Sequence, residues 1–282
     1  MTLSSRTSAA PTRTSPPTRR QLRFLDRYGP AALVTGASSG IGREIAHRLA
    51  EGGFDLVLVA RREAELRALA DELTARHGID ARALPLDLAR PDDLERLAAA
   101  TSDTDIGLCI AAAGFGTSGP LIESPLTRER EMVDLNCAAV LTLSWIYGRR
   151  LADRGRGGLI LLSSIVAFQG TPHAAHYAAT KAYVQTLAEG LHVELKARGV
   201  DVLAAAPGPV NSGFADAAGM RMGRALSPRD VAQRSLDALG RRPTAFPGLS
   251  SRFLKDSLAP LPRRARVRIM GTVMRGMTVH RR

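Results

Sequence analysis

The chain has 282 residues, of which 45% are hydrophobic and 23% charged, a composition that excludes a fibrous or wholly disordered protein. Its net charge of +12 is carried by the two ends, residues 1–28 and 249–282, while residues 29–248 between them are close to neutral. A nucleic-acid-binding protein needs a basic face on its folded body, so we expect no nucleic-acid partner.

The two cysteines, Cys109 and Cys137, both lie in apolar stretches, which favours two reduced, buried thiols, although a disulfide between them is compatible with the sequence. No apolar run reaches the roughly 18 residues of a membrane-spanning helix. The N-terminus has no apolar stretch typical of a signal peptide. The sequence therefore predicts a cytoplasmic protein.

Residues 1–28 are rich in Ser, Thr, Pro and Arg and show almost no periodic apolar residues. Such a segment cannot bury enough surface to offset the entropy lost on ordering, so we predict a disordered N-terminal extension. The same Arg- and Ser-rich, acid-poor composition is compatible with an organellar transit peptide, which we favour less because no amphipathic helix is evident.

From residue 31 onward, short apolar runs alternate with longer stretches of helical periodicity. Strands are predicted at 31–35, 55–60, 81–86, 106–113, 158–163 and 200–206, with a short last strand at 244–246. Helices are predicted near 40–52, 63–77, 91–100, 125–152, 174–198 and 227–240. Strands this apolar are buried on both faces, which predicts an α/β fold: a Rossmann-type, doubly wound parallel sheet in one domain, residues 29–248.

A glycine-rich turn joins the first predicted strand to the first helix of this domain. Glycines there permit a tight turn, and the helix N-terminus attracts a pyrophosphate through its free N–H groups and its dipole. The spacing is Gly-x₃-Gly-x-Gly rather than the more familiar GxGxxG. The predicted phosphate-binding residues are Gly36, Ser38, Ser39, Gly40, Ile41 and Gly42.

The second predicted strand ends where a doubly wound fold recognises the adenosine ribose of a dinucleotide. An acid there would bind the 2′-hydroxyl of NAD, but Ala60 stands in its place and Arg61 and Arg62 follow. Arginines can pair with the 2′-phosphate of NADP. The two could also be solvated charges that open the next helix, but together with the missing acid they favour NADP over NAD.

Tyr177 and Lys181 lie four residues apart in a predicted helix and so share a face. An ammonium beside a phenol would lower the phenol's pKa from about 10 toward neutrality, as an acid/base catalyst requires. By itself the pair is weak evidence, because the same spacing is common in ordinary helices.

Several motifs in the same order resemble the short-chain dehydrogenases/reductases, over roughly residues 31 to 215. Thr35 to Gly42 resembles their TGxxxGIG loop, and Pro207 to Ser212 resembles their PGxVxT turn. The resemblance implies a catalytic tetrad of Asn136, Ser164, Tyr177 and Lys181. It also implies cofactor contacts at Asp87, Leu88, Ala113, Gly114, Tyr177, Lys181, Pro207, Gly208, Val210 and Ser212.

The resemblance assigns a role to each member of the tetrad. Tyr177 would exchange a proton with the reacting oxygen, Ser164 would hydrogen-bond that oxygen, and Lys181 would bind the nicotinamide ribose. Asn136 would hold a water molecule that relays protons. The chain departs from the family at Ala112, where an asparagine usually ties adjacent strands, and at Ser212, which replaces a threonine.

The substrate is less well specified by the sequence. The residues predicted to surround it are mostly apolar: Phe115, Ile165, Phe168, Phe214 and Met220. Such surroundings favour a hydrophobic ketone, lipid or ketoacyl-like compound. His173 and His176 flank this region, where we expect them to pack or to be solvated, and no metal is expected.

The basic C-terminal extension, residues 249–282, has apolar residues interleaved with arginines. It could lie on a membrane surface as a peripheral contact, but packing against its own domain or a partner subunit is slightly favoured. We expect an NADP(H)-dependent oxidoreductase that forms a homo-oligomer, a dimer or a tetramer. The alternative is a non-catalytic NADP-binding regulator or scaffold on the same fold.

Overall fold

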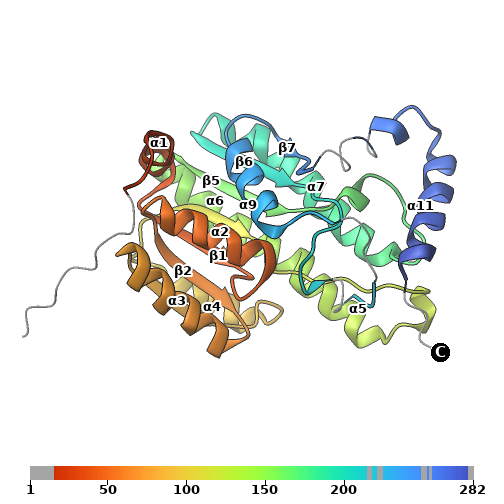
Figure 1. Cartoon of the computed structure of the whole chain (residues 1–282), viewed down its shortest axis with the longest axis horizontal. Coiled ribbons are helices and arrows are strands. Elements are labelled where there is room, and N and C mark those ends of the chain that lie inside the picture. The colour runs from red at the N-terminus through yellow and green to blue at the C-terminus, as the bar shows by residue number, and fades with distance from the viewer. Residues whose placement is uncertain (1–15, 215–217, 221–224, 249–252, 254–255, 279–282) are drawn as a thin grey trace, which may run out of the picture.

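A single parallel sheet of seven strands forms the centre of the molecule (Figure 1). The structure is a computed structural model, and it describes residues 16–214, 218–220, 225–248, 253 and 256–278. The strand order is β3-β2-β1-β4-β5-β6-β7. The strands are β1 (Ala31–Thr35), β2 (Asp55–Ala60), β3 (Ala81–Pro85), β4 (Ile106–Ala111), β5 (Gly157–Leu162), β6 (Val200–Ala205) and β7 (Thr244–Ala245). This is the doubly wound Rossmann-type fold that the sequence predicts.

Helices cover both faces of the sheet, so successive residues of the central strands pack into two different cores. Val34 faces the core made with α2 (Gly40–Glu51), α3 (Glu63–His77) and α9 (Pro228–Ala238). Its neighbour Leu33 faces the core made with α4 (Pro91–Ala100), α6 (Ala139–Arg154) and α7 (Ala175–Lys196). Strands buried on both faces explain the continuous apolar runs of the sequence.

The order of the strands reverses between β1 and β4, which are hydrogen-bonded neighbours although they are distant in the sequence. In such sheets the crevice for a ligand opens at this reversal, beyond the carboxyl ends of the strands. The segments that follow β1, β4, β5 and β6 therefore meet at one edge of the sheet.

The helix predicted at 125–152 is interrupted. It consists of α5 (Leu126–Val133), a π-helical turn η2 (Asp134–Ala138) and α6. Single π turns inside helices occur often at functional sites, because the wider turn re-aims a side chain. Here the turn contains Asn136, whose side chain is completely buried.

The disorder predicted for residues 1–28 is wrong for the part that the structure describes. Helix α1 (Arg19–Tyr28) begins at a capping box formed by Thr18 and Gln21. Its Tyr28 is buried and donates a hydrogen bond of 2.7 Å to Asp201. The composition argument failed because a few apolar and aromatic residues suffice when a helix docks on a preformed surface. Residues 1–15 lie outside the described residues.

Two short 3-10 turns and a C-terminal helix complete the fold. The turns are η1 (Leu121–Glu123) and η3 (Ile165–Phe168), and the helix is α11 (Arg263–Met277). Helix α11 packs on its own domain at the end opposite α1 (Figure 1). Among the described residues, no helix is both long and apolar enough to cross a membrane.

Candidate active site

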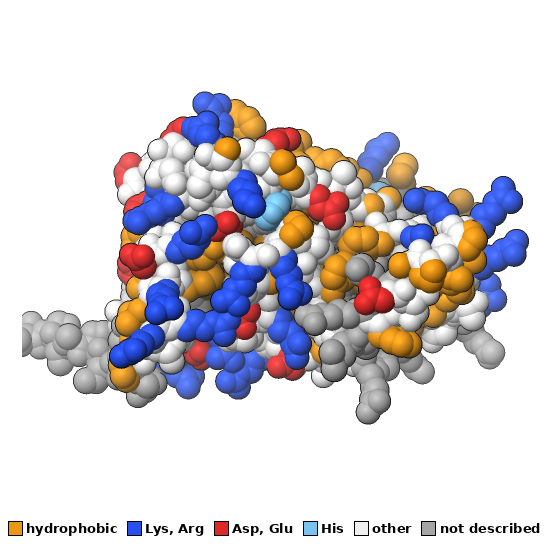
Figure 2. Space-filling model, turned by 90° about the horizontal axis from the view of Figure 1, so that it is seen from above, with side chains coloured by type: hydrophobic (Ala, Val, Ile, Leu, Met, Phe, Trp, Pro, Cys, Tyr) orange, Lys and Arg blue, Asp and Glu red, His pale blue; other side chains and the backbone are white. Residues whose placement is uncertain are grey.

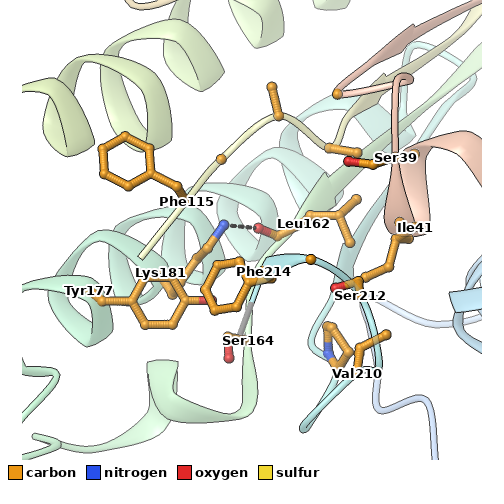
Figure 3. A pocket seen from close by; sticks show the side chains of 18 of the residues that line it. Ser39, Ile41, Phe115, Leu162, Ser164, Tyr177, Lys181, Val210, Ser212 and Phe214 are labelled. Atoms are coloured by element: carbon orange, nitrogen blue, oxygen red, sulfur yellow. Dashed lines mark hydrogen bonds between the residues drawn. The ribbon is translucent and has the colours of Figure 1, made fainter. Parts of the chain in front are cut away.

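A cavity of about 530 Å³ opens at the carboxyl edge of the sheet, next to the strand-order reversal. Of the predicted site residues, all but Asn136 line it. Figure 3 shows the phosphate-loop residues Ser39 and Ile41 at one end and Tyr177 and Phe214 at the other. The sheet topology thus brings together predicted site residues from seven separate segments of the chain.

The glycine-rich turn has the geometry of a phosphate-binding loop. Gly40 has a φ of +57°, in the left-handed region that favours glycine, and it begins helix α2. A Cβ atom on Gly42 would lie 2.5 Å from the carbonyl oxygen of Gly36, so only glycine lets the helix pack this close to the strand. The free N–H groups at the start of α2 therefore face the cavity as anion donors.

The two arginines after β2 make different contacts. Arg62 donates from Nη2 to the hydroxyl of Ser38 at 3.0 Å, which places a cation beside the phosphate loop. Arg61 instead forms an ion pair with Glu131 of α5 at 3.0 Å. Arg62 also pairs with Glu65, but at 3.7 Å, a longer contact than that of Arg61 with Glu131. The 2′-phosphate of NADP would therefore fit the pair of Arg62 and Ser38 best, because Arg62 is the less tightly held arginine and contacts the phosphate loop.

Next to Ala112, Thr35 at the end of β1 makes hydrogen bonds to the segment that follows β4. The Thr35 hydroxyl donates to the carbonyl of Ile110 at 3.3 Å and accepts from the amides of Ala112 and Ala113 at 3.0 and 3.1 Å. A threonine therefore ties β1 to the segment after β4. This cross-strand role of Thr35 was not predicted from the sequence.

Tyr177 lies at the end of the cavity opposite the phosphate loop, half-buried near the start of α7. Burial raises its pKa to about 12, and a hydrogen bond with Ser164 lowers it only in part. The sequence predicted the opposite direction, a pKa lowered by Lys181. That prediction is wrong for this structure because burial dominates and Lys181 is not among the groups that shift the pKa of Tyr177.

The Lys181 ammonium donates instead to the carbonyl of Leu162 at 2.7 Å, as the dashed line in Figure 3 shows. Burial lowers the pKa of Lys181 to about 8. A Cβ atom on Gly114 would lie 3.4 Å from the Lys181 nitrogen and 2.8 Å from the Asn136 amide oxygen. The lysine, the asparagine and the segment after β4 therefore meet at one point.

Asn136 holds the backbone rather than lining the cavity. Its amide oxygen accepts from the Phe115 amide at 3.1 Å, and its nitrogen donates to the Phe115 carbonyl at 2.9 Å and to Thr180 at 3.1 Å. These three bonds fix the segment after β4 against helix α7. The proton relay assigned to Asn136 stays a prediction.

The substrate end of the cavity is apolar, as predicted, with one exception. Phe115, Ile165, Phe214 and Met220 line it. Phe168, which we also predicted there, packs against Phe246 with ring centres 5.3 Å apart and is not among the described residues that line the cavity.

Five further lining residues, in α11 and α5, were missed by sequence reasoning. Helix α11 supplies Met270, Val273, Met274 and Met277 to the substrate end. Arg128 of α5 lies over the Phe115 ring, 3.7 Å from its centre. The only signal for the methionines was their apolar face on a basic helix, which does not show where that helix docks.

The two flanking histidines have structural partners. His176, directly before Tyr177, lies 2.5 Å from a carboxylate oxygen of the buried Glu129. Burial alone would raise the pKa of Glu129, but hydrogen bonds from Ser124 and His176 outweigh it and hold that pKa below its usual value. The His173 carbonyl accepts from the Gly119 amide at 2.8 Å. Both contacts shape the loops around the start of α7.

Comparison with known proteins agrees with the fold. The family model for short chain dehydrogenases matches residues 30–221, so the chain belongs to this family. It is 31% identical to a 7beta-hydroxysteroid dehydrogenase of Clostridium sardiniense over 84% of this chain and 93% of that protein. It is 36% identical to a very-long-chain 3-oxoacyl-CoA reductase of Neurospora crassa over 64% of this chain, which amounts to 56% of the relative. The chain therefore matches only about half the length of that second relative.

Among solved structures, a short-chain dehydrogenase from Sphingobium yanoikuyae in complex with NADPH superimposes with a TM-score of 0.76. The two are 32% identical, and the match covers 86% of this chain and 95% of the other. The family's fold is therefore present over most of the chain.

Proposed function

We propose that this protein is an NADP(H)-dependent oxidoreductase that interconverts a hydrophobic ketone and the corresponding secondary alcohol. The observation that carries the proposal is the single cavity shared by the phosphate loop, the Arg62–Ser38 pair and the Tyr177–Ser164 pair. NADP(H), when bound, supplies or accepts the hydride. Three similar proteins support the proposal: a short-chain dehydrogenase solved in complex with NADPH, a 7beta-hydroxysteroid dehydrogenase and a very-long-chain 3-oxoacyl-CoA reductase.

The residues present fit the cofactor. The start of α2 offers backbone N–H groups to the pyrophosphate, and the glycine contacts leave no room for side chains there. Arg62 and Ser38 would hold the 2′-phosphate, and Asp87 and Leu88 would meet the adenine. Ser212 of the turn after β6 lies close to Gly40, whose Cβ atom would be 3.2 Å from the serine's own, so this turn would cover the nicotinamide end.

The proton chemistry belongs to Tyr177. In the reductive direction its hydroxyl donates a proton to the ketone oxygen, and in the oxidative direction the phenolate removes the alcohol proton. Ser164, hydrogen-bonded to Tyr177, would donate to the same oxygen as negative charge develops. Lys181 would lower the pKa of Tyr177 only if its ammonium left the Leu162 carbonyl and moved toward the phenol, so we propose that this hydrogen bond changes during the reaction.

The apolar substrate end favours a bulky substrate over a small polar one. Aromatic and methionine side chains there offer only dispersion and hydrophobic contacts, which bind an apolar carbon skeleton well. The tilted contact between Tyr177 and Phe214, with ring centres 5.4 Å apart, places an aromatic wall beside the reacting hydroxyl.

We also propose a homo-oligomer. Adjacent helices α6 and α7 expose large apolar side chains to solvent, among them Trp145 at 61% and Val193 at 73%. Burial of such side chains against a second copy would be favourable. Light scattering of the wild type and of Trp145→Glu tests this, because only the wild type should assemble.

The proposed function is tested by a panel of cyclic, aryl and long-chain ketones with NADPH and NADH. We expect oxidation of NADPH by at least one hydrophobic ketone and a clear preference over NADH. If neither dinucleotide binds in a fluorescence titration, the oxidoreductase proposal is overturned. Binding of NADPH without turnover of any ketone would favour the non-catalytic scaffold.

A further inference from the structure

A second cavity, of about 640 Å³, lies at the edge of the sheet opposite the active site. Tyr28, shortly before β1, and Phe54, directly before β2, both line it, which places it at the amino ends of these strands. Helix α1 forms one side, and the C-terminal ends of α2 and α9 form the other. The two cavities share no lining residue, so the proposed oxidoreductase chemistry does not account for the second one.

Arginines dominate the lining of this second cavity. Six of them line it, together with a single carboxylate, Asp237; they are Arg19, Arg20, Arg23, Arg27, Arg48 and Arg241. Figure 2 shows Lys and Arg side chains gathered on the left half of the molecule, where Figure 1 places α1. The five net positive charges of the lining far exceed the negative partial charges, about half a unit each, at the ends of α2 and α9. The second cavity therefore attracts anions.

Half of the arginines in this lining have no anionic partner. The paired ones are Arg20 with Asp237, Arg27 with Asp201 and Arg48 with Glu51. Arg19, Arg23 and Arg241 make no ion pair or side-chain hydrogen bond within the part of the chain that the structure describes. Residues 1–18, which precede α1, contain no Asp or Glu that could neutralise them. The counter-charge for these three arginines therefore has to come from solution.

Aromatic rings lie between the arginines of the second cavity. Phe24 of α1 is only partly buried, and its ring packs on those of Tyr28 and Phe54, with centres 4.6 and 5.8 Å away. Tyr28 and Phe54 are buried, and Tyr28 is held by its hydrogen bond to Asp201. A planar ring would stack on Phe24 or on a guanidinium, because aromatic and guanidinium faces both bind flat rings. The cavity thus combines a stacking surface with cations.

We propose that this second cavity binds a free nucleotide with several phosphate groups, an inference that does not depend on the proposed function. Arg19, Arg23 and Arg241 would pair with the phosphates, and the base would stack on Phe24. Arginine suits this role because its planar guanidinium forms paired hydrogen bonds with phosphate oxygens. The volume lies in the range of small-molecule pockets. Residues 29–248 are close to neutral and offer no basic track beyond the cavity, which disfavours a nucleic-acid strand.

Calorimetry with ATP tests this inference, on protein that holds one equivalent of NADPH so that the cofactor end of the active-site cavity is filled first. One ATP should bind per chain. Arg23→Ala/Arg241→Ala should weaken it at least about tenfold, because two phosphate contacts are lost. The matched control, Arg229→Ala/Arg234→Ala, removes two exposed arginines of α9 that do not line the cavity. Because salt screens distant charges, the control should change the Kd by less than about twofold.

A second measurement needs no variant and so does not depend on how the variants fold. Tripolyphosphate, which lacks the base, should bind the wild type at least about fivefold more weakly than ATP, because stacking is lost. Adenosine, which lacks the phosphates, should show no measurable binding. Tripolyphosphate that binds as tightly as ATP would overturn the nucleotide assignment.

Three further results would also overturn the inference. The first is a wild type that does not bind ATP, and the second is an equal loss in the two double variants, which would indicate unspecific attraction by the net charge. The third is ATP binding that Arg62→Ala weakens and Arg23→Ala/Arg241→Ala does not, because the nucleotide would then lie in the active-site cavity. Tighter binding of an oligothymidylate than of ATP would replace the nucleotide with a single-stranded nucleic acid.

Discussion

The cofactor end and the substrate end of the cavity are built in different ways. The cofactor end comes from turns directly after β1, β2 and β4, where hydrogen bonds to the backbone fix the geometry. The substrate end comes from loops and from α11, where apolar side chains pack on one another. Side-chain packing tolerates substitution better than a hydrogen-bonded turn does. The cofactor end can therefore keep the chemistry common to a family while the residues of the substrate end change.

Among the substitutions that should affect one end of the cavity and not the other, we expect the largest change in binding at Arg62. Arg62→Ala should weaken NADPH binding by about ten- to hundredfold, because a charge-assisted contact with the 2′-phosphate is lost. NADH binding and the Kd of the ketone should stay unchanged. Fluorescence titration with both dinucleotides measures this.

Arg61→Ala is the matched comparison for Arg62. Its guanidinium is already held by Glu131, so we expect a loss below about tenfold. A larger loss at Arg61 than at Arg62 would contradict the assignment of Arg62 and Ser38 to the phosphate.

The lowered pKa of Lys181 predicts a pH dependence of stability at the cofactor end. The folded pKa is about 8 and the ordinary value is 10.5, so the unfolded chain binds more protons between these pH values. The free energy of unfolding of the cofactor-free protein should therefore gain a rising contribution from pH 8 to pH 10.5 and lose it as the pH falls. Urea denaturation at a series of pH values gives the unfolding free energy of the wild type and of Lys181→Met. Between pH 8 and pH 10.5 this free energy should rise more steeply with pH in the wild type. Equal dependence on pH in the two proteins would rule out a buried, destabilised ammonium.

The smallest effect concerns the link between β1 and β4. Thr35→Val keeps the shape of the side chain but removes a hydroxyl that makes three hydrogen bonds, so it should cost about 1–3 kcal/mol of unfolding free energy. Thr35→Ser keeps the hydroxyl and should cost less. Denaturation in urea measures both, and a stable Thr35→Val with a destabilised Thr35→Ser would contradict the account.

The sequence predicts the cofactor end well because that end depends on local spacing. Gly36 to Gly42, Arg62 and Tyr177 each lie within a few residues of a strand end or on one helix face, so their positions follow from the period of the element that carries them. The sheet and most helix bounds follow for the same reason.

The parts that could not be predicted depend on tertiary packing. The docking of α11 over Tyr177, the π turn at Asn136 and the ordered helix α1 all arise from contacts between distant segments. The pKa of Tyr177 also escaped prediction, because it depends on burial and on the direction in which Lys181 points. Spacing along a helix indicates that two groups share a face, but it does not show which partner each group chooses.

The most direct test of the central claim compares wild type with Tyr177→Phe in two assays on the same preparations. NADPH binding should weaken by less than about tenfold, because Tyr177→Phe removes at most one hydrogen bond to the cofactor and leaves the phosphate loop and the Arg62–Ser38 pair intact. Turnover of a ketone substrate at saturation should fall by about a thousandfold, because the proton donor is gone. A Tyr177→Phe protein that reduces the ketone at nearly the wild-type rate would contradict the assignment of Tyr177 as the acid/base group.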